Sequence, residues 1–191
     1  MIKRIVLLPF AILFFSCSTV HMPVPGESKV VKESIYSEYL TIADAYVDQA
    51  KYDKAVLYYK KAMKNRKLYW NSYYKLGRCY AYSKNWNEAQ KVYLELYKRD
   101  RNNVSVQMSL AYIYAMNGNL TSAENIYAYL WENNSENADI LVNYINVLIA
   151  EEKYKEAKEF FHVLKEKFHE NSNISSFEKK FEEIENSEKE D

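Results

Sequence analysis

Apolar side chains recur along most of this chain at intervals of three and four residues, and charged or polar residues fill the places between them. This spacing puts the apolar side chains on one face of a helix and the polar ones on the other. Short polar stretches separate one such segment from the next. The pattern predicts an all-α protein built from a succession of short amphipathic helices.

The helical pattern itself repeats every thirty-four residues, in four copies at 36–69, 70–103, 104–137 and 138–171. The twentieth position of the copies holds Ala55, Ala89, Ala123 and Ala157, and the twenty-fourth holds Tyr59, Tyr93, Tyr127 and Phe161. Each copy contains two amphipathic segments, and a helical hairpin of that size can bury its apolar face only against its neighbours. We therefore expect residues 35–171 to form an α-solenoid of four hairpins. A plain helical bundle with chance periodicity is the alternative, which the agreement of several positions across all copies disfavours.

Small residues mark where the two helices of a hairpin come together. The eighth position holds Ala43, Gly77, Ala111 and Ile145, and the twentieth holds the four alanines. Two helix axes can approach closely only where no large side chain stands between them. The large aromatic residues at the other apolar positions are then expected to fill the space around this contact.

The second copy has the clearest motif, which consists of Tyr73, Leu76, Gly77, Tyr80, Trp86, Ala89 and Tyr93. With these residues at this period, the chain resembles a tetratricopeptide-repeat (TPR) protein over residues 36–171. The family usually has proline near the end of each repeat, where this chain has Lys67, Arg101, Ser135 and His169. Asn-rich segments around Asn103, Asn137 and Asn171 are expected to end one helix and cap the next through side-chain hydrogen bonds.

One more apolar stripe follows the fourth copy, and it consists of Ile174, Phe177, Phe181 and Ile184. We expect residues 172–187 to form a capping helix, whose apolar side covers the last repeat and whose charged side faces water, as the end of a solenoid requires. Residues 188–191 are expected to form an acidic, solvated tail.

The start of the chain differs from the repeats. Lys3 and Arg4 precede an apolar run over residues 5–15, which is too short to span a bilayer, and Cys17 follows at the polar end of the run. Residues 1–17 therefore resemble a bacterial lipoprotein signal peptide, which implies that Cys17 is acylated. An ordinary cleaved signal with an incidental cysteine is the alternative.

The segment between this signal and the first repeat, residues 18–34, contains Pro23, Pro25 and Gly26 and shows no helical pattern. We expect it to be a flexible tether. Such a tether would keep the solenoid close to the membrane, where a weak partner is met at high effective concentration.

The charge balance and the rarer residue types exclude several classes of function. The chain has 26 basic and 26 acidic side chains and no basic stripe, so nucleic acid is not an expected partner. Its three glycines cannot build a phosphate-binding loop, and its three histidines have no cysteine or carboxylate at ligand spacing. We expect no enzyme activity, no metal site and no cofactor. With Cys17 acylated, Cys79 has no disulfide partner and is expected to be a small buried apolar residue.

In TPR proteins the first helix of each repeat lines the concave side, so the resemblance implies a partner-binding groove there. The candidate residues are Asp44, Tyr74, Arg78, Tyr82, Met108, Tyr112, Met116 and Asn146. Tyrosine, arginine and methionine are common at binding surfaces, although single residues of this set could instead only enlarge the core.

The expected function is that of a non-catalytic, membrane-anchored adaptor. It would dock a peptide or helix of a bacterial cell-envelope protein, on the periplasmic face of the outer membrane, and so scaffold an envelope complex for outer-membrane assembly, pilus biogenesis or cell-wall enzyme regulation. A self-associating structural module that leaves the groove unused is the alternative.

Overall fold

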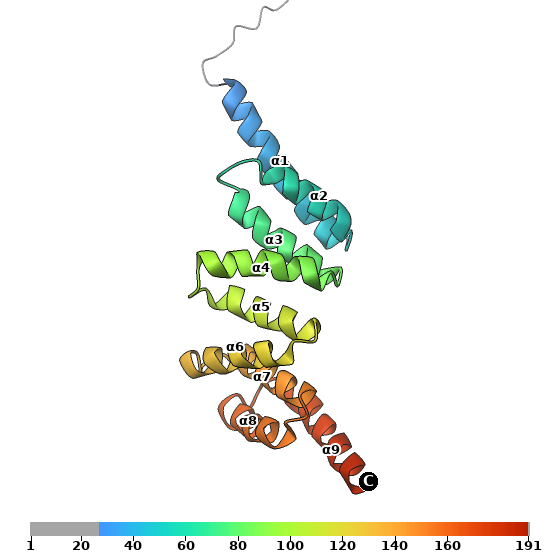
Figure 1. Cartoon of the computed structure of the whole chain (residues 1–191). Coiled ribbons are helices and arrows are strands. Elements are labelled where there is room, and N and C mark those ends of the chain that lie inside the picture. The colour runs from blue at the N-terminus through green and yellow to red at the C-terminus, as the bar shows by residue number, and fades with distance from the viewer. Residues whose placement is uncertain (1–26, 191) are drawn as a thin grey trace, which may run out of the picture.

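The computed structural model describes residues 27–190, and within this range the chain forms nine α-helices and no strand. The helices are α1 (Glu27–Asp48), α2 (Tyr52–Ala62), α3 (Tyr69–Tyr82), α4 (Trp86–Arg99), α5 (Val104–Met116), α6 (Leu120–Asn133), α7 (Ala138–Ala150), α8 (Tyr154–Lys167) and α9 (Ile174–Glu190). They stack in chain order, from α1 at one end to α9 at the other (Figure 1). The all-α solenoid that the sequence predicts is confirmed.

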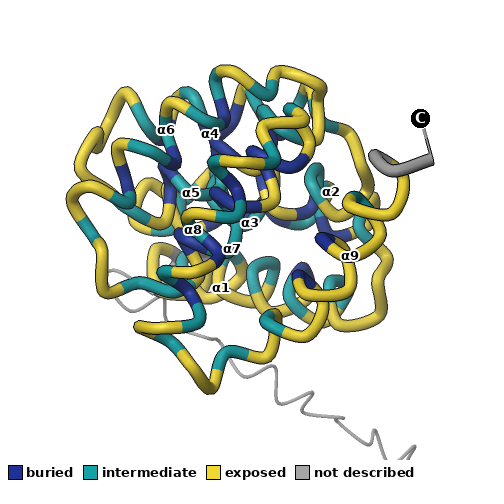
Figure 2. Tube along the Cα trace, turned by 90° about the horizontal axis from the view of Figure 1, so that it is seen from below, coloured by how far each residue is buried: buried dark blue, intermediate teal, exposed yellow. Residues whose placement is uncertain are grey.

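The thirty-four-residue period sets where the helices begin. The second helices of the four hairpins, α2, α4, α6 and α8, begin at the seventeenth position of their repeats, at Tyr52, Trp86, Leu120 and Tyr154. Each helix packs chiefly on the helices directly before and after it in the chain. The core consists of two adjoining clusters of buried residues, and the partly buried Tyr114 and Ile126 pack against both. Figure 2 shows the buried residues on the inner sides of the helices.

The small positions hold the helices of each hairpin close together. The four alanines of the twentieth position are fully buried. At Gly77 the approach is tighter still, because a Cβ atom there would lie 2.7 Å from Cγ1 of Val92 and 2.9 Å from the ring of Tyr93. Cys79 is also buried, as predicted, and burial raises the pKa of its thiol to about 11. It therefore stays protonated at neutral pH and packs as an apolar residue.

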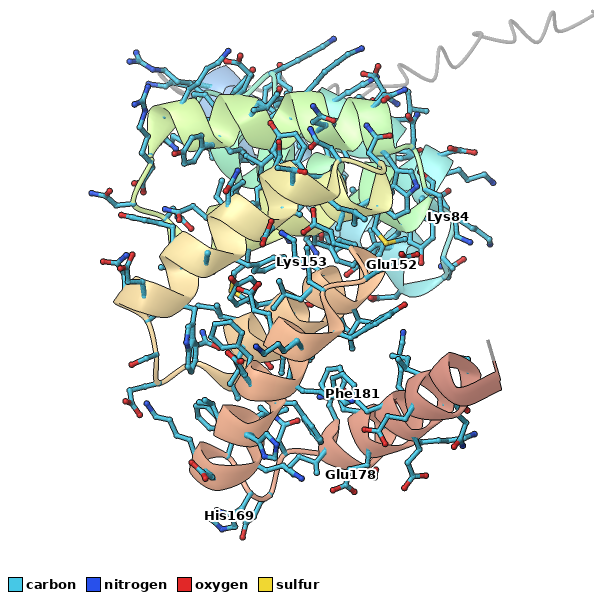
Figure 3. All side chains as sticks on the ribbon, turned by 60° about the horizontal axis from the view of Figure 1, so that its bottom comes forward. Lys84, Glu152, Lys153, His169, Glu178 and Phe181 are labelled. Carbon is cyan, nitrogen blue, oxygen red and sulfur yellow. The ribbon has the colours of Figure 1, made fainter. Side chains whose placement is uncertain are left out.

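The turn inside each hairpin has the same backbone geometry in all four repeats. The fifteenth position has positive φ, with 54° at Ala50, 58° at Lys84, 83° at Gly118 and 60° at Glu152. Figure 3 labels Lys84 and Glu152 at two of these turns. Only one of the four residues is glycine, the residue type that adopts this conformation without strain.

Two of the three Asn-rich segments cap the next helix as predicted, whereas the side chain of Asn171 accepts from the N–H of Asn173, which lies before α9. The Oδ1 atom of Asn103 accepts a hydrogen bond from the backbone N–H of Val106 at the start of α5. The side chain of Asn137 caps α7 in the same way, by accepting from the N–H of Asp139. These caps satisfy N–H groups that have no partner within the helix.

Two predicted boundaries were wrong. Helix α1 begins at Glu27, so residues 27–34 of the predicted tether are helical, and α9 continues to Glu190 through most of the predicted tail. Extending a helix that is already packed costs far less than nucleating a new one, and neither stretch contains proline or glycine. The predicted signal peptide, the predicted acylation site Cys17 and the first part of the predicted tether, residues 18–26, lie outside the described residues.

The final helix covers the last repeat. Phe177 and Phe181 of α9 are buried, and their ring centroids lie 5.7 and 5.3 Å from that of Phe161 on α8. Figure 3 shows Phe181 directed from α9 toward α8. Among the residues that the structure describes, no helix combines the length and apolar character that crossing a membrane requires.

Candidate functional site

Three neighbouring pockets lie along the first helices of the repeats. The central pocket has a volume of about 350 Å³ and is lined mainly by α3 and α5. A pocket of about 200 Å³ lies toward the N-terminal end, between α1, α2 and α3, and one of about 260 Å³ lies toward the C-terminal end, between α5, α6 and α7. Arg78 and Tyr82 line both the N-terminal and the central pocket, and Tyr112 lines both the central and the C-terminal one. We call the three pockets together the groove.

Each of the eight candidate residues lines this groove. Asp44 lines the N-terminal pocket, Met116 and Asn146 line the C-terminal one, and the other five line the central one. They stand at the fifth, ninth and thirteenth positions of the repeats, and residues four apart lie on the same face of a helix. The structure thus brings the candidates together, while their binding of a partner remains a prediction.

Tyrosines of the second helices also reach the groove, which the sequence did not indicate. The rings of Tyr59, Tyr93 and Tyr127 are buried, yet all three residues line groove pockets. The hydroxyl of Tyr127 donates a hydrogen bond to the carbonyl oxygen of Met108, 3.2 Å away. Burial raises the pKa of all three hydroxyls above the usual value, so they remain protonated donors on the floor of the groove. One difference between the repeats could have indicated this. The fourth repeat has Phe161, which has no hydroxyl, at the equivalent position, and this residue packs against α9 and lines no groove pocket.

Asp44 is already paired inside the groove. Its carboxylate lies 2.7 Å from Nζ of Lys75 and accepts a hydrogen bond from the hydroxyl of Tyr59. Lys75, on α3, was not among the candidates, although it stands one helical turn before Cys79 and Arg78 on the same helix. This pair joins the first two repeats, so Asp44 offers a partner less charge than its sequence position suggested.

Arg78 is the charged residue of the central pocket. Its Nη2 atom donates a hydrogen bond to the hydroxyl of Tyr82, 2.5 Å away, and this bond raises the pKa of the guanidinium. Within residues 27–190 no carboxylate forms an ion pair with it. The remaining N–H groups of its guanidinium are therefore available to a ligand carboxylate or carbonyl group.

The rest of the groove combines apolar walls with hydrogen-bond acceptors. Tyr82, Tyr112 and Met116 are each nearly half exposed, which is unusual for such large apolar side chains. On α7, the Nδ2 atoms of Asn143 and Asn146 donate to carbonyl oxygens one turn earlier in the helix. Their Oδ1 atoms are left to accept from a ligand, as backbone N–H groups of a bound segment would require.

This arrangement favours binding over catalysis. The central and C-terminal pockets offer a guanidinium, hydroxyl groups, amide oxygens and apolar surface, and the N-terminal pocket adds the paired side chains of Asp44 and Lys75. No group of three or more potential metal ligands occurs among the residues that the structure describes. The fold and the groove define an α-solenoid with a surface suited to an extended or helical segment.

Comparison with known families identifies the solenoid type. Sequence profiles of the tetratricopeptide repeat match residues 40–86, 80–139 and 114–180. The chain belongs to the tetratricopeptide-repeat family, whose fold commonly serves as a protein-binding scaffold. No curated protein sequence matches the chain.

Solved structures show the same fold at low sequence identity. MamA from Desulfovibrio magneticus RS-1, from residue 41 to its end, has a TM-score of 0.65 at 15% identity, over 72% of this chain and 77% of that one. A tetratricopeptide-repeat protein from Parabacteroides merdae ATCC 43184 has a TM-score of 0.64 at 21% identity, over 73% of this chain and 56% of that one. YrrB, described as having an unusual peptide-binding site, has a TM-score of 0.58 at 18% identity, over 73% of both chains.

Proposed function

We propose that this protein is a non-catalytic, lipid-anchored adaptor of the bacterial cell envelope, whose groove docks an extended or helical segment of another envelope protein. The observation that supports docking is the central pocket, where Arg78 has no carboxylate partner among the described side chains and stands beside half-exposed Tyr82 and Tyr112. Charged donors next to exposed aromatic rings are typical of the residues that contribute most to protein binding. The solved peptide-binding relative YrrB is in keeping with a peptide or protein ligand.

The groove is tested by affinity capture from the native cell with the full chain. The Arg78→Glu, Tyr82→Ala double variant should lose the partners that the wild type recovers, because both changes fall in the central pocket. An Arg101→Glu, Tyr129→Ala variant makes the same chemical changes at exposed positions that line no groove pocket, and it should recover them. Equal recovery by the wild type and the groove variant would refute the proposal.

The anchor is tested separately. If Cys17 carries more than one acyl chain, the protein should enter the detergent phase when it is partitioned between detergent and water. A single acyl chain would bind a membrane only marginally. A Cys17→Ser variant should move to the aqueous phase and lose label from a fatty-acid analogue. If the wild type takes up no fatty acid, the groove proposal survives but the lipid anchor does not.

A further inference from the structure

The first helix of the solenoid exposes a face that is buried in every later repeat. At the seventh position Ile42 is 37% exposed, whereas Leu76, Leu110 and Tyr144 are 3%, 2% and 5% exposed. At the tenth position Ala45 is exposed, whereas Cys79, Ile113 and Val147 are buried. The same positions therefore behave differently only in the first repeat.

The order of the described helices explains the difference. In the second, third and fourth repeats, the helix that precedes the first helix packs directly on it, as α2 does on α3, α4 on α5 and α6 on α7. No described helix precedes α1. The space next to the exposed face of α1 thus corresponds to the space that a packed helix fills in each later repeat.

The exposed face also begins before the first residue of the first repeat. It continues toward the start of α1 with the spacing of a helix-packing seam, and we define the α1 stripe as Val31, Ile35, Glu38, Ile42 and Ala45. Val31 is 52% exposed and Ile35 is 40% exposed. Helix α1 has 22 residues and α2 only 11, so the first turns of α1 project beyond α2 (Figure 1). None of the stripe residues lines the groove.

The opposite end of the solenoid lacks such a face. There α9 covers the last repeat, and its outward residues, among them Glu178, Lys179, Glu182 and Glu183, are charged and exposed. Stacking of copies end to end is therefore disfavoured, because the apolar stripe of one copy would meet the charged side of α9 in the next.

The charge of Glu38 on the stripe also disfavours pairing between the α1 helices of two copies. Glu38 lies in the middle of the stripe, is exposed, and has no ion-pair partner among the described side chains. Two α1 helices paired antiparallel, with Val31 of each facing Ile42 of the other, would bring both Glu38 carboxylates to the centre of one interface. Like charges there are unfavourable, whereas a lysine or arginine would be stabilised.

We propose that the α1 stripe docks an amphipathic helix of another protein, one that has an apolar stripe with a lysine or arginine near its middle. The docked helix extends the solenoid by one element and pairs its basic side chain with Glu38. This surface is distinct from the groove, so the protein can hold two segments at once.

Site-specific photocrosslinking in the native cell tests the surface. The full chain is made with p-benzoylphenylalanine at Ile35 or Ile42, and at Leu57 as a control, an equally large apolar residue that is 53% exposed on α2. The proposal predicts an adduct from the two stripe positions only, and mass spectrometry should map it to an amphipathic segment with a basic residue within one turn. Adducts only to a second copy, to lipid or to residues 1–26, no specific adduct, or a segment without that basic residue would each overturn it.

Charge reversal then tests the role of Glu38 with a synthetic peptide of the mapped segment. Glu38→Lys should raise the peptide Kd by at least about tenfold, and a peptide whose basic residue is changed to Glu should bind this variant better than it binds the wild type. Glu182→Lys, an equal charge change on the outer side of α9, should leave the Kd unchanged. An unchanged Kd for the Glu38→Lys variant, with its helix content intact by circular dichroism, would refute the pairing.

Discussion

At the scale of single residues, the backbone is strained at the turn positions where a residue other than glycine has a positive φ. Lys84 has a φ of 58°, is exposed, and forms no ion pair with a described residue. A side chain in this conformation costs about 1 kcal/mol relative to glycine. We therefore expect Lys84→Gly to raise the free energy of unfolding by about 1 kcal/mol, measured by chemical denaturation.

A matched substitution separates the backbone effect from the loss of charge. Lys84→Ala removes the charge and keeps the Cβ atom, so it should give no comparable gain. Gly118→Ala should lower the free energy of unfolding by about 1 kcal/mol, because Gly118 has a φ of 83° and nothing near its Cβ position to compensate. A gain from Lys84→Ala equal to that from Lys84→Gly would show that charge, not φ, is responsible.

Replacing Gly77 by alanine is expected to lower the stability of the protein, whereas the same change raises it at most helical glycines. At an open helical site, Gly→Ala stabilises by about 1 kcal/mol. Here the new methyl group would collide with Val92 and Tyr93, and forcing atoms into a packed core costs about 1 to 3 kcal/mol. Gly77→Ala should therefore lower the melting temperature, and an increase would show that α3 and α4 can move apart freely.

At the scale of elements, the capping helix depends on its two phenylalanines. Phe181→Ala would remove a buried ring that packs on Phe161, and such losses cost about 3 to 5 kcal/mol. We expect a lower denaturation midpoint and faster amide hydrogen exchange in α8 and α9. Lys180→Ala, on the exposed side of α9, should change neither quantity. If the Phe181→Ala variant showed faster exchange in α9 alone, that result would contradict a role for α9 in stabilising α8.

The elements also show where sequence reasoning succeeds and where it fails. The period predicted two helices in each repeat and their contact at Ala55 and its equivalents, because small residues let two helices approach closely, and these alanines are fully buried. The resemblance to tetratricopeptide repeats implied which positions of the first helices line the concave side, and the four-residue spacing of these positions keeps them on one helix face. The start of α1 was missed because Val31 alone, four residues before Ile35, extends the apolar spacing into residues 27–34. Lys75 was missed because its pairing with Asp44 joins two repeats, and positions within one repeat do not encode that contact.

At the scale of the whole molecule, buried tyrosines link stability to alkaline pH. Burial raises the pKa of Tyr59, Tyr93 and Tyr127, and it raises that of Tyr144 to about 12. An unfolded tyrosine ionises near a pKa of about 10. The folded state thus retains protons that the unfolded state releases, so this contribution is complete below about pH 10 and is lost as the pH rises through the folded pKa values.

We expect the free energy of unfolding to fall steeply above about pH 10, with the buried tyrosines ionising only as the chain unfolds. Absorbance of the phenolate at 295 nm and denaturation midpoints across this range would measure both. Tyr127→Phe removes one titrating group and should lose less stability over the same interval. Ionisation of all tyrosines near the ordinary pKa, without unfolding, would contradict the burial that the structure shows.

Packing between consecutive helices also bears on how the chain reaches this structure. Each helix meets its main neighbours in the order in which the ribosome makes them. A partly synthesised chain already has nearly all the contacts that its finished helices will ever make, so it need not wait for distant segments. Apart from the α1 stripe, only the newest hairpin leaves an apolar side open, and synthesis of α9 closes that side.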